Sequence, residues 1–115
     1  MNDADCLFCK IVRGEIPSRK LYEDGDVVAF EDIQPQAPTH FLVIPKRHIP
    51  TLDDVKEGDE ALVGRVLTVA SRLAREKGLA DDGYRQIINC GKYGGQIVFH
   101  LHAHVVGGRQ LGKMG

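Results

Sequence analysis

The spacing of apolar positions changes several times along the chain, and each change marks a predicted element. Apolar, β-branched and aromatic residues predominate in residues 20–23, 27–31 and 39–45, which predicts three short strands. The turn sequence Asp24-Gly25-Asp26 joins the first two strands and predicts an antiparallel hairpin. Residues 32–38 contain two prolines and predict a fixed loop, because proline cannot donate a hydrogen bond within a sheet.

A helical period replaces the strand pattern in two places. Residues 7–14 predict a short helix that ends at Gly14, and a long helix is predicted from about Asp59 to Lys77. One face of the long helix is apolar, and it is expected to pack against the core. Its members are Leu62, Val63, Val66, Leu67, Ala70, Leu73 and Ala74.

The last part of the chain returns to strand patterns. Residues 84–89 alternate as a strand, residues 91–96 form a glycine-rich loop, and residues 100–106 predict a final strand. The order of elements predicts an α+β fold, an antiparallel sheet of about five strands with one long and one short helix. A chain of 115 residues is expected to form a single domain over residues 1–115.

Three of the five histidines stand at every second position of the final strand, at His100, His102 and His104. Side chains alternate between the two faces of a strand, so the three imidazoles are expected in one row, about 7 Å apart. Leu101, Ala103 and Val105 would then face the core. Such a row suits either nucleophilic and acid–base chemistry on an anion or a metal site, and the residues alone leave both open.

The charge composition limits the classes of binding partner that the chain is expected to have. The chain has 15 basic and 16 acidic residues and a net charge of −1, which gives no electrostatic reason to expect nucleic acid or a membrane surface as partner. The acidic N-terminus lacks the pattern of a signal peptide, and no apolar run approaches the roughly 18 residues of a membrane span. We therefore expect a cytoplasmic protein.

Two features near the histidines favour chemistry on a phosphate. Backbone N–H groups near Gly94 and Gly95 can approach an anion closely, because glycine carries no side chain. Asn89 can add an amide donor, although capping of its strand would explain it equally well. A neutral imidazole is a competent nucleophile when a fixed acceptor holds the proton on its far nitrogen.

These residues resemble a known family. The run from His100 to Val106 has the pattern of the histidine triad (HIT) superfamily, and further blocks are similar to its nucleotide-binding, Hint-like branch over almost the whole chain. The blocks are Phe8-Cys9-Lys10-Ile11, Glu15-Ile16-Pro17, Glu23-Asp24, the segment from Ala37 to Lys46, Gly94-Gly95-Gln96 and Gly107-Gly108-Arg109.

The resemblance implies a HIT-like fold, a homodimer whose two sheets join, and hydrolysis of purine nucleoside 5′-phosphoramidates without a catalytic cofactor. It makes His102 the nucleophile that takes the nucleotidyl group. His104 and His40 would orient it and contact phosphate oxygens, and His100 would help to fix it through its backbone. From the residues alone, His40 is equally well explained as a structural histidine of its strand.

The resemblance also implies a binding site for the substrate, an AMP-like or GMP-like purine nucleotide. Asp32 would hold the ribose hydroxyls, although the residues alone favour a turn role for it. The base would lie among Ile33, Phe8, Ile11 and Leu42. Phosphate would be bound by Asn89 and by the backbone of Gly95, Gln96 and Ile97.

Two departures from the family pattern concern the leaving group. Some members have a serine where this chain has Ile97. Some have a tryptophan near the C-terminus, and this chain contains no tryptophan. Two alternative functions are open. One is a dinucleoside polyphosphate hydrolase or nucleotidyl transferase that uses the same histidine, and the other is a nucleotide-sensing interaction module with incidental hydrolysis.

Cys6 and Cys9 form a Cys-x-x-Cys pair, whose spacing suits a structural Zn²⁺ with His48 and His100 as the further ligands. The alternative is a pair of reduced cysteines packed under the short helix. Zinc ligation by His100 requires a bend at the start of the last strand, because a regular strand would keep it on the face of His102. The third cysteine, Cys90, is expected to be a small apolar core residue.

Overall fold

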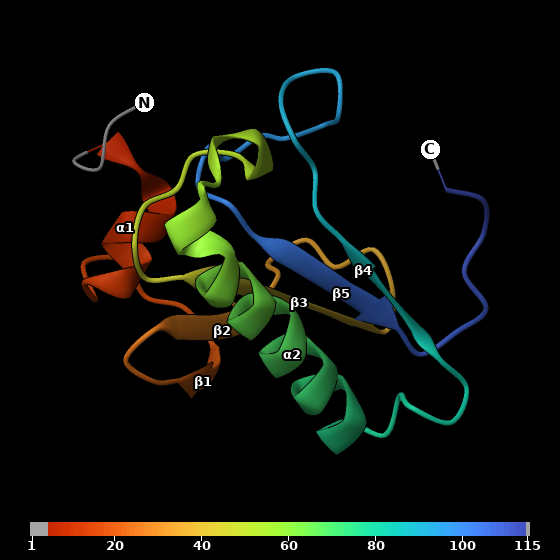
Figure 1. Ribbon diagram of the computed structural model, residues 1–115. Coiled ribbons are helices and arrows are strands. Elements are labelled where there is room, and N and C mark those ends of the chain that lie inside the picture. Colours follow the sequence, from red (N-terminus) through yellow and green to blue (C-terminus); the bar gives the residue numbers. More distant parts are fainter. Residues whose placement is uncertain (1–4, 115) are drawn as a thin grey trace.

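A five-stranded antiparallel sheet forms the centre of the computed structural model, which describes residues 5–114. The strand order is β1-β2-β3-β5-β4 (Figure 1). The strands are β1 Lys20–Glu23, β2 Val27–Glu31, β3 Thr39–Pro45, β4 Tyr84–Ile87 and β5 Ala103–Gly107. The helices are α1 Leu7–Val12 and α2 Glu60–Glu76, with single 3-10 turns at Leu52–Asp54 and Glu57–Asp59. The predicted α+β fold is confirmed.

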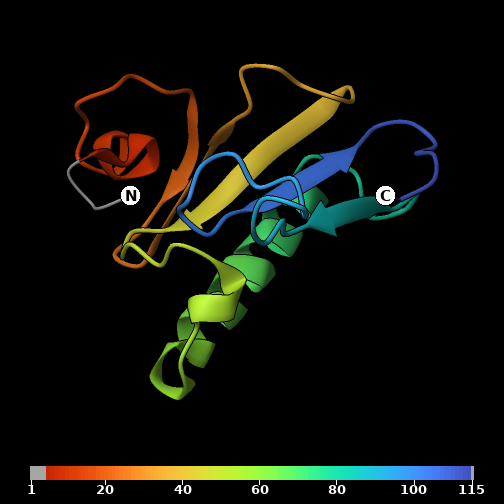
Figure 2. The same cartoon turned by 90° about the horizontal axis from the view of Figure 1, so that it is seen from above.

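The two α-helices cover opposite faces of the sheet, as Figure 2 shows. Successive residues of a strand face opposite sides, so β2 and β3 contribute to two separate apolar clusters. Val27, Ala29, Phe41 and Val43 pack under α2. The alternate residues of the same strands pack on the other side with Cys6, Cys9 and the apolar side chains of α1.

The buried face of α2 differs from the predicted stripe at two positions. Leu67 is 36% exposed, whereas Val69 is almost fully buried and packs with Val66 and Leu73. Val69 lies three residues after Val66 and four before Leu73, which places all three on one side of the helix. The sheet covers this side, and Leu67 lies in a surface hollow beside Gln86 of the edge strand β4.

The last strand starts later than the sequence predicted. β5 begins at Ala103, so His100 and His102 lie in the irregular segment before it, and the expected regular row of three histidines is wrong. The N–H of Leu101 donates to the carbonyl oxygen of Ile49 at 2.7 Å, a long-range bond outside the sheet that holds the bend. Leu101, Ala103 and Val105 are buried as expected.

Two further observations concern sequence expectations. Cys90 is exposed in the segment after β4, so its expected place in the core is wrong. Within the described part of the chain, neither α-helix is both long and apolar enough to cross a membrane.

Candidate active site

The face of the sheet that is turned away from α2 carries three of the histidines close together. His40 lies on β3 and His104 on β5, and Leu42 pairs with His104 in the antiparallel register. The rings of His40 and His104 have centroids 5.2 Å apart, and the ring of His102 lies 4.9 Å from that of His104. His40 and His102 are buried, and His104 is partly buried.

The hydrogen bond of His102 determines which of its nitrogens can react. Its Nδ1–H donates to the carbonyl oxygen of His100 at 2.7 Å. A carbonyl oxygen can only accept, so the proton of the neutral ring lies on Nδ1 and Nε2 carries a free electron pair. His102 therefore presents the nucleophilic form of imidazole.

A chain of hydrogen bonds gives His104 the opposite tautomer. The backbone N–H of Gln36 donates to Nδ1 of His40 at 3.0 Å, so the proton of neutral His40 lies on Nε2. That Nε2–H donates to Nδ1 of His104 at 3.0 Å, and the carboxylate of Asp32 lies 3.4 Å from the same Nε2 of His40. The proton of His104 is then on Nε2, where it can be donated to an oxygen of a bound phosphate.

Burial keeps the two reactive rings neutral. The pKa of His102 is lowered mainly by burial, which its bond to the His100 carbonyl and the charge of Asp32 partly offset. The pKa of His104 is lowered to about 4 by burial and by the neighbouring rings of His102 and His40. At neutral pH both rings are uncharged, which nucleophilic attack by His102 requires.

The glycine-rich loop before β5 is tightly braced. A side chain at Gly94 would place its Cβ 2.5 Å from the carbonyl oxygen of Cys90, so only glycine fits there. The Asn89 amide donates to the Gly94 carbonyl at 2.7 Å. The side-chain amide of Gln96 is buried and donates to the carbonyl of Pro50 at 2.8 Å, while its oxygen accepts from the N–H of Gly91 at 2.8 Å.

The backbone donors of this loop are partly engaged within it. The N–H of Gly95 donates to the carbonyl of Lys92 at 3.1 Å, and that of Gln96 to the carbonyl of Gly91 at 3.0 Å. Ile97 is 87% exposed at the end of the loop. Phosphate binding by this backbone stays a prediction.

Three of the four residues expected around the base lie on or against α1. Phe8, Ile11 and Leu42 are buried in one apolar cluster, and the ring of Phe8 lies 5.1 Å from that of His102. Ile33 is 94% exposed on the loop between β2 and β3. On the same loop, Asp32 accepts a bond from the N–H of Gln34 at 2.7 Å, so the turn role suggested by its sequence is present.

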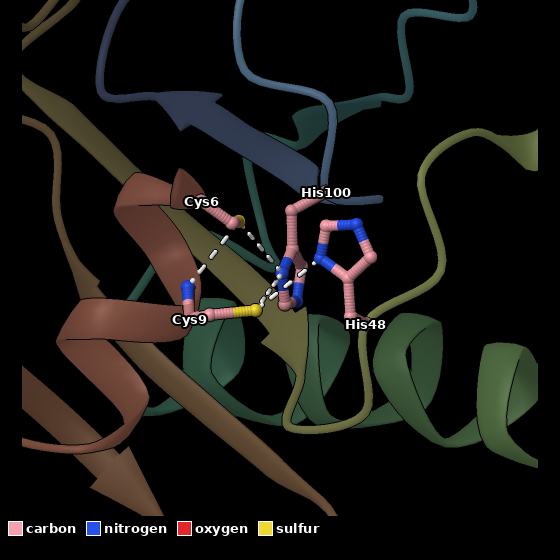
Figure 3. Close-up of side chains that lie close together, drawn as sticks. All are labelled: Cys6, Cys9, His48 and His100. Carbon is pink, nitrogen blue, oxygen red and sulfur yellow. Dashed lines mark hydrogen bonds between the residues drawn. The ribbon is translucent and has the colours of Figure 1, made fainter. Parts of the chain in front are cut away.

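A second cluster joins Cys6 and Cys9 with His48 and His100 (Figure 3). Nδ1 of His100 lies 3.4 Å from Sγ of Cys6 and 3.5 Å from Sγ of Cys9, and Nδ1 of His48 lies 3.2 Å from Sγ of Cys9. All four ligand atoms lie within 4.8 Å of one another. The bend before β5 is thus the one that metal ligation by His100 was expected to need.

The donor set fits a tetrahedral metal ion. Bond lengths of about 2.3 Å for Zn–S and 2.0 Å for Zn–N give a sulfur–nitrogen edge of about 3.5 Å, close to the separations found here. The Nε2–H of His100 donates to the carbonyl oxygen of Pro45 at 2.7 Å, so Nδ1 of the neutral ring faces the sulfurs with its electron pair. These four side chains can hold a metal ion.

Three backbone groups fix histidine tautomers in these sites, and the family resemblance had implied one of them, the backbone of His100. The N–H of Gln36, the carbonyl of Pro45 and the carbonyl of His100 each fix a histidine tautomer. Every residue has such groups, so residue type gives no signal for them. Gln96 was expected to contribute only its backbone, and the bracing role of its buried side chain was missed.

An antiparallel sheet that carries one imidazole with an available Nε2 electron pair, a neighbouring ring with an Nε2–H donor and a cluster of four possible metal ligands suits a small domain for covalent chemistry on a phosphate. The HIT domain family model matches residues 13–111 of the chain. The chain therefore belongs to the histidine triad family.

Comparisons with known proteins agree in sequence and in structure. The chain is 52% identical over 110 residues to the purine nucleoside phosphoramidase of Escherichia coli K12, which covers 96% of this chain and 92% of the relative. A histidine triad protein of Clostridium difficile superposes with a TM-score of 0.94 at 46% identity, over 100% of both chains. A zinc-bound histidine triad protein of Mycobacterium smegmatis has a TM-score of 0.81 at 38% identity, over 94% of this chain and 78% of its own.

Proposed function

We propose that this chain hydrolyses purine nucleoside phosphoramidates through a nucleotidyl intermediate on His102. The observation that carries the proposal is the 2.7 Å bond from Nδ1–H of His102 to the His100 carbonyl, which leaves the Nε2 electron pair available. The similarity to the Escherichia coli purine nucleoside phosphoramidase supports this substrate class. The histidine nucleophile and the neutral state of both rings supply the chemistry.

The reaction proceeds in two displacements at phosphorus. The Nε2 electron pair of His102 forms a bond to phosphorus, and the electron pair of the P–N bond leaves with the amine nitrogen, which takes up a proton from solvent. Water then attacks phosphorus, its proton returns to solvent, and the bond to His102 breaks to release nucleoside monophosphate. His104 donates from Nε2–H to a phosphate oxygen in both steps, where the negative charge increases.

The remaining site residues hold the nucleotide. Asp32 binds the ribose hydroxyls, and the base lies against the apolar side chains of Ile33, Phe8, Ile11 and Leu42. Phosphate is bound by Asn89 and by the backbone at Gly95, Gln96 and Ile97. The large exposed surface of Ile33 supports this arrangement, because a bound base would cover it.

The test replaces His102 with alanine. Turnover of adenosine 5′-phosphoramidate should fall by at least about a thousandfold, because the covalent step is lost, whereas nucleoside monophosphate binding should remain. Quenched wild-type reactions should contain an adenylated peptide that includes His102, detected by mass spectrometry. Retained turnover in the variant, or an adduct on another histidine, would contradict the mechanism.

A substrate panel separates the proposed activity from its alternatives. Phosphoramidates and dinucleoside polyphosphates with the same nucleoside should differ in kcat/KM in favour of the phosphoramidates. The reverse order would favour a polyphosphate hydrolase or nucleotidyl transferase. Binding of nucleoside monophosphate without turnover of either class would favour a nucleotide sensor.

We also propose that Cys6, Cys9, His48 and His100 hold a structural Zn²⁺. The support is the tetrahedral donor spacing, the burial of the two cysteines and of His100, and the zinc-bound histidine triad protein with the same fold. The ion would tie α1 to the bend before β5, because two ligands stand at the start of α1 and one in that bend.

A homodimer is the proposed assembly, with the edge strand β4 of each copy extending the sheet of the other. β4 stands at the end of the strand order, so one side of its backbone has no strand partner within the described chain. Beside it, α2 and β4 enclose a surface hollow lined by Leu67, Thr68, Ser71, Arg75, Tyr84 and Gln86. An exposed leucine in such a hollow suits a protein partner of matching shape.

A further inference from the structure

A second cavity, of about 340 Å³, lies on the same face of the sheet as the reactive histidines. It is lined by His40, His104 and Asn89, and also by three cationic side chains, Arg85, Arg109 and Lys113. None of the described side chains that line it is a carboxylate. A cationic space therefore begins at the phosphate-handling residues.

The strand register explains why Arg85 faces this cavity. Ile87 pairs with His104, and Arg85 pairs with Val106 two positions further along. Residues two apart on a strand share a face and lie about 7 Å apart, so Arg85 is on the same side as His104. The intervening Gln86 points to the other face, where its amide donates to Ser71 of α2 at 2.9 Å.

The two arginines are held by uncharged partners. A guanidinium nitrogen of Arg85 donates to the carbonyl of Gly112 at 2.8 Å, which fixes the C-terminal segment beside the cavity. Gly108 has a φ of +94°, and a Cβ there would lie 3.0 Å from Pro38, so this turn needs glycine. The turn directs Arg109 across to the carbonyl of Gln36 at 3.1 Å. Carbonyl oxygens orient the guanidinium groups without cancelling their charge.

The order of rings places this cavity on the leaving-group side. Along the face, Phe8 contacts His102, and His102 contacts His104, which lines the cavity. In a displacement at phosphorus, the bond that breaks points away from the attacking nitrogen. A nucleoside bound beside α1 and attacked by His102 would therefore release its amine toward His104 and the cavity.

We propose that Arg85, with Arg109 and Lys113, selects phosphoramidates whose leaving amine carries a carboxylate, as in an α-amino acid linked through its amino nitrogen. The inference rests on the proposed phosphoramidase function and concerns the half of the substrate that the nucleoside-binding residues do not contact. Arg85 is the central residue, because its strand position fixes it on the face of His104.

The experiment compares adenosine 5′-phosphoramidates of glycine and of glycinamide, which differ in charge but little in shape. Wild-type kcat/KM should be about fivefold higher for the glycine compound, as expected for a partly exposed charge pair. In Arg85→Gln, which keeps a side chain that can donate to Gly112, the ratio should fall to about one. Added salt should reduce the wild-type ratio in the same direction, because it screens exposed charges.

The control is Arg72→Gln, which removes an equal charge on α2, where Arg72 stacks on Tyr22 across the sheet from the cavity. The ratio in this variant should equal that of the wild type. Equal kcat/KM for both compounds in the wild type, or a ratio that Arg85→Gln leaves unchanged, would overturn the subsite while the phosphoramidase function stands. Failure to hydrolyse either compound would overturn both.

Discussion

Cys6 caps α1 and is a proposed metal ligand, and a pair of substitutions can separate these two roles. Its sulfur is a metal-ligand candidate 3.4 Å from Nδ1 of His100, and it also caps α1 by accepting a bond from the N–H of Cys9 at 3.3 Å. Serine is a good N-cap residue but lacks the thiolate, whereas alanine provides neither function. Cys6→Ser therefore removes the ligand alone, and Cys6→Ala removes the ligand and the cap.

The expected free energies follow from these contacts. Without metal, Cys6→Ser should have a free energy of unfolding within about 0.5 kcal/mol of the wild type, and Cys6→Ala should lose about 1 kcal/mol through the missing cap. With free Zn²⁺ at about a thousand times its Kd, the wild type should gain about 4 kcal/mol, since the ion binds the folded state. Cys6→Ser should gain a small fraction of this, because only three ligands remain.

The assay is urea denaturation followed by circular dichroism, in reducing buffer at one protein concentration, with buffered Zn²⁺ or with a chelator. The fixed concentration matters because a dimer gains stability with concentration. A wild type that Zn²⁺ does not stabilise would refute the metal site. An equal gain in Cys6→Ser would show that the ion binds elsewhere, for example at the reactive histidines.

Three further outcomes test the active site and the assembly. Burial lowers the pKa of His102, so the ring stays neutral as pH falls through the ordinary imidazole value of about 6.5. The acid limb of the kcat/KM profile should therefore lie below that pH. An acid limb at or above about pH 6.5 would contradict a neutral nucleophile. Gly94→Ala should lower kcat/KM about tenfold or more, because its Cβ would lie 2.5 Å from the carbonyl oxygen of Cys90. Gly25→Ala, which has open space around it, should match the wild type. Equal kinetics in the two variants would refute the tight loop. In sedimentation velocity, Leu67→Glu should weaken the proposed dimer at least about tenfold, while Leu52→Glu, a change at another exposed leucine, should not. A dimer that the Leu67 change leaves unaffected would place the interface elsewhere.

Local patterns predicted most of the scaffold. The bounds expected for residues 27–31 and 39–45 agree with β2 and β3, because both strands combine β-branched runs with clear turn or proline boundaries. Leu67 was misplaced because helical period shows which residues share a side but not how far the sheet extends beneath it. Cys90 was misplaced for a related reason, since residue type alone does not determine burial near a loop.

The part of the site that could not be predicted depends on contacts between distant segments. As a local pattern, residues 100–106 alternate like one strand, yet His100 meets Cys6, Cys9 and His48 and donates to the Pro45 carbonyl. The Cys-x-x-Cys spacing and the positions of His48 and His100 indicated the residues of this cluster, but not which nitrogen of each ring is protonated. Those states depend on backbone donors and acceptors that only the folded chain brings together.

His100 links the two sites through different atoms of one residue. Its ring faces the two sulfurs of the cluster, while its carbonyl oxygen holds the Nδ1–H of His102. The cysteines lie on the same side of the sheet as His102, and the segment before β5 leaves the strand register there, since the N–H of Leu101 donates to the carbonyl of Ile49. The bend therefore sends the ring of His100 toward the cysteines beside α1 and leaves its carbonyl facing His102. α1 also contributes Phe8, whose ring contacts both His100 and His102. An ion bound by the cluster would therefore stabilise both the position of α1, against which the nucleoside is proposed to bind, and the orientation of His102.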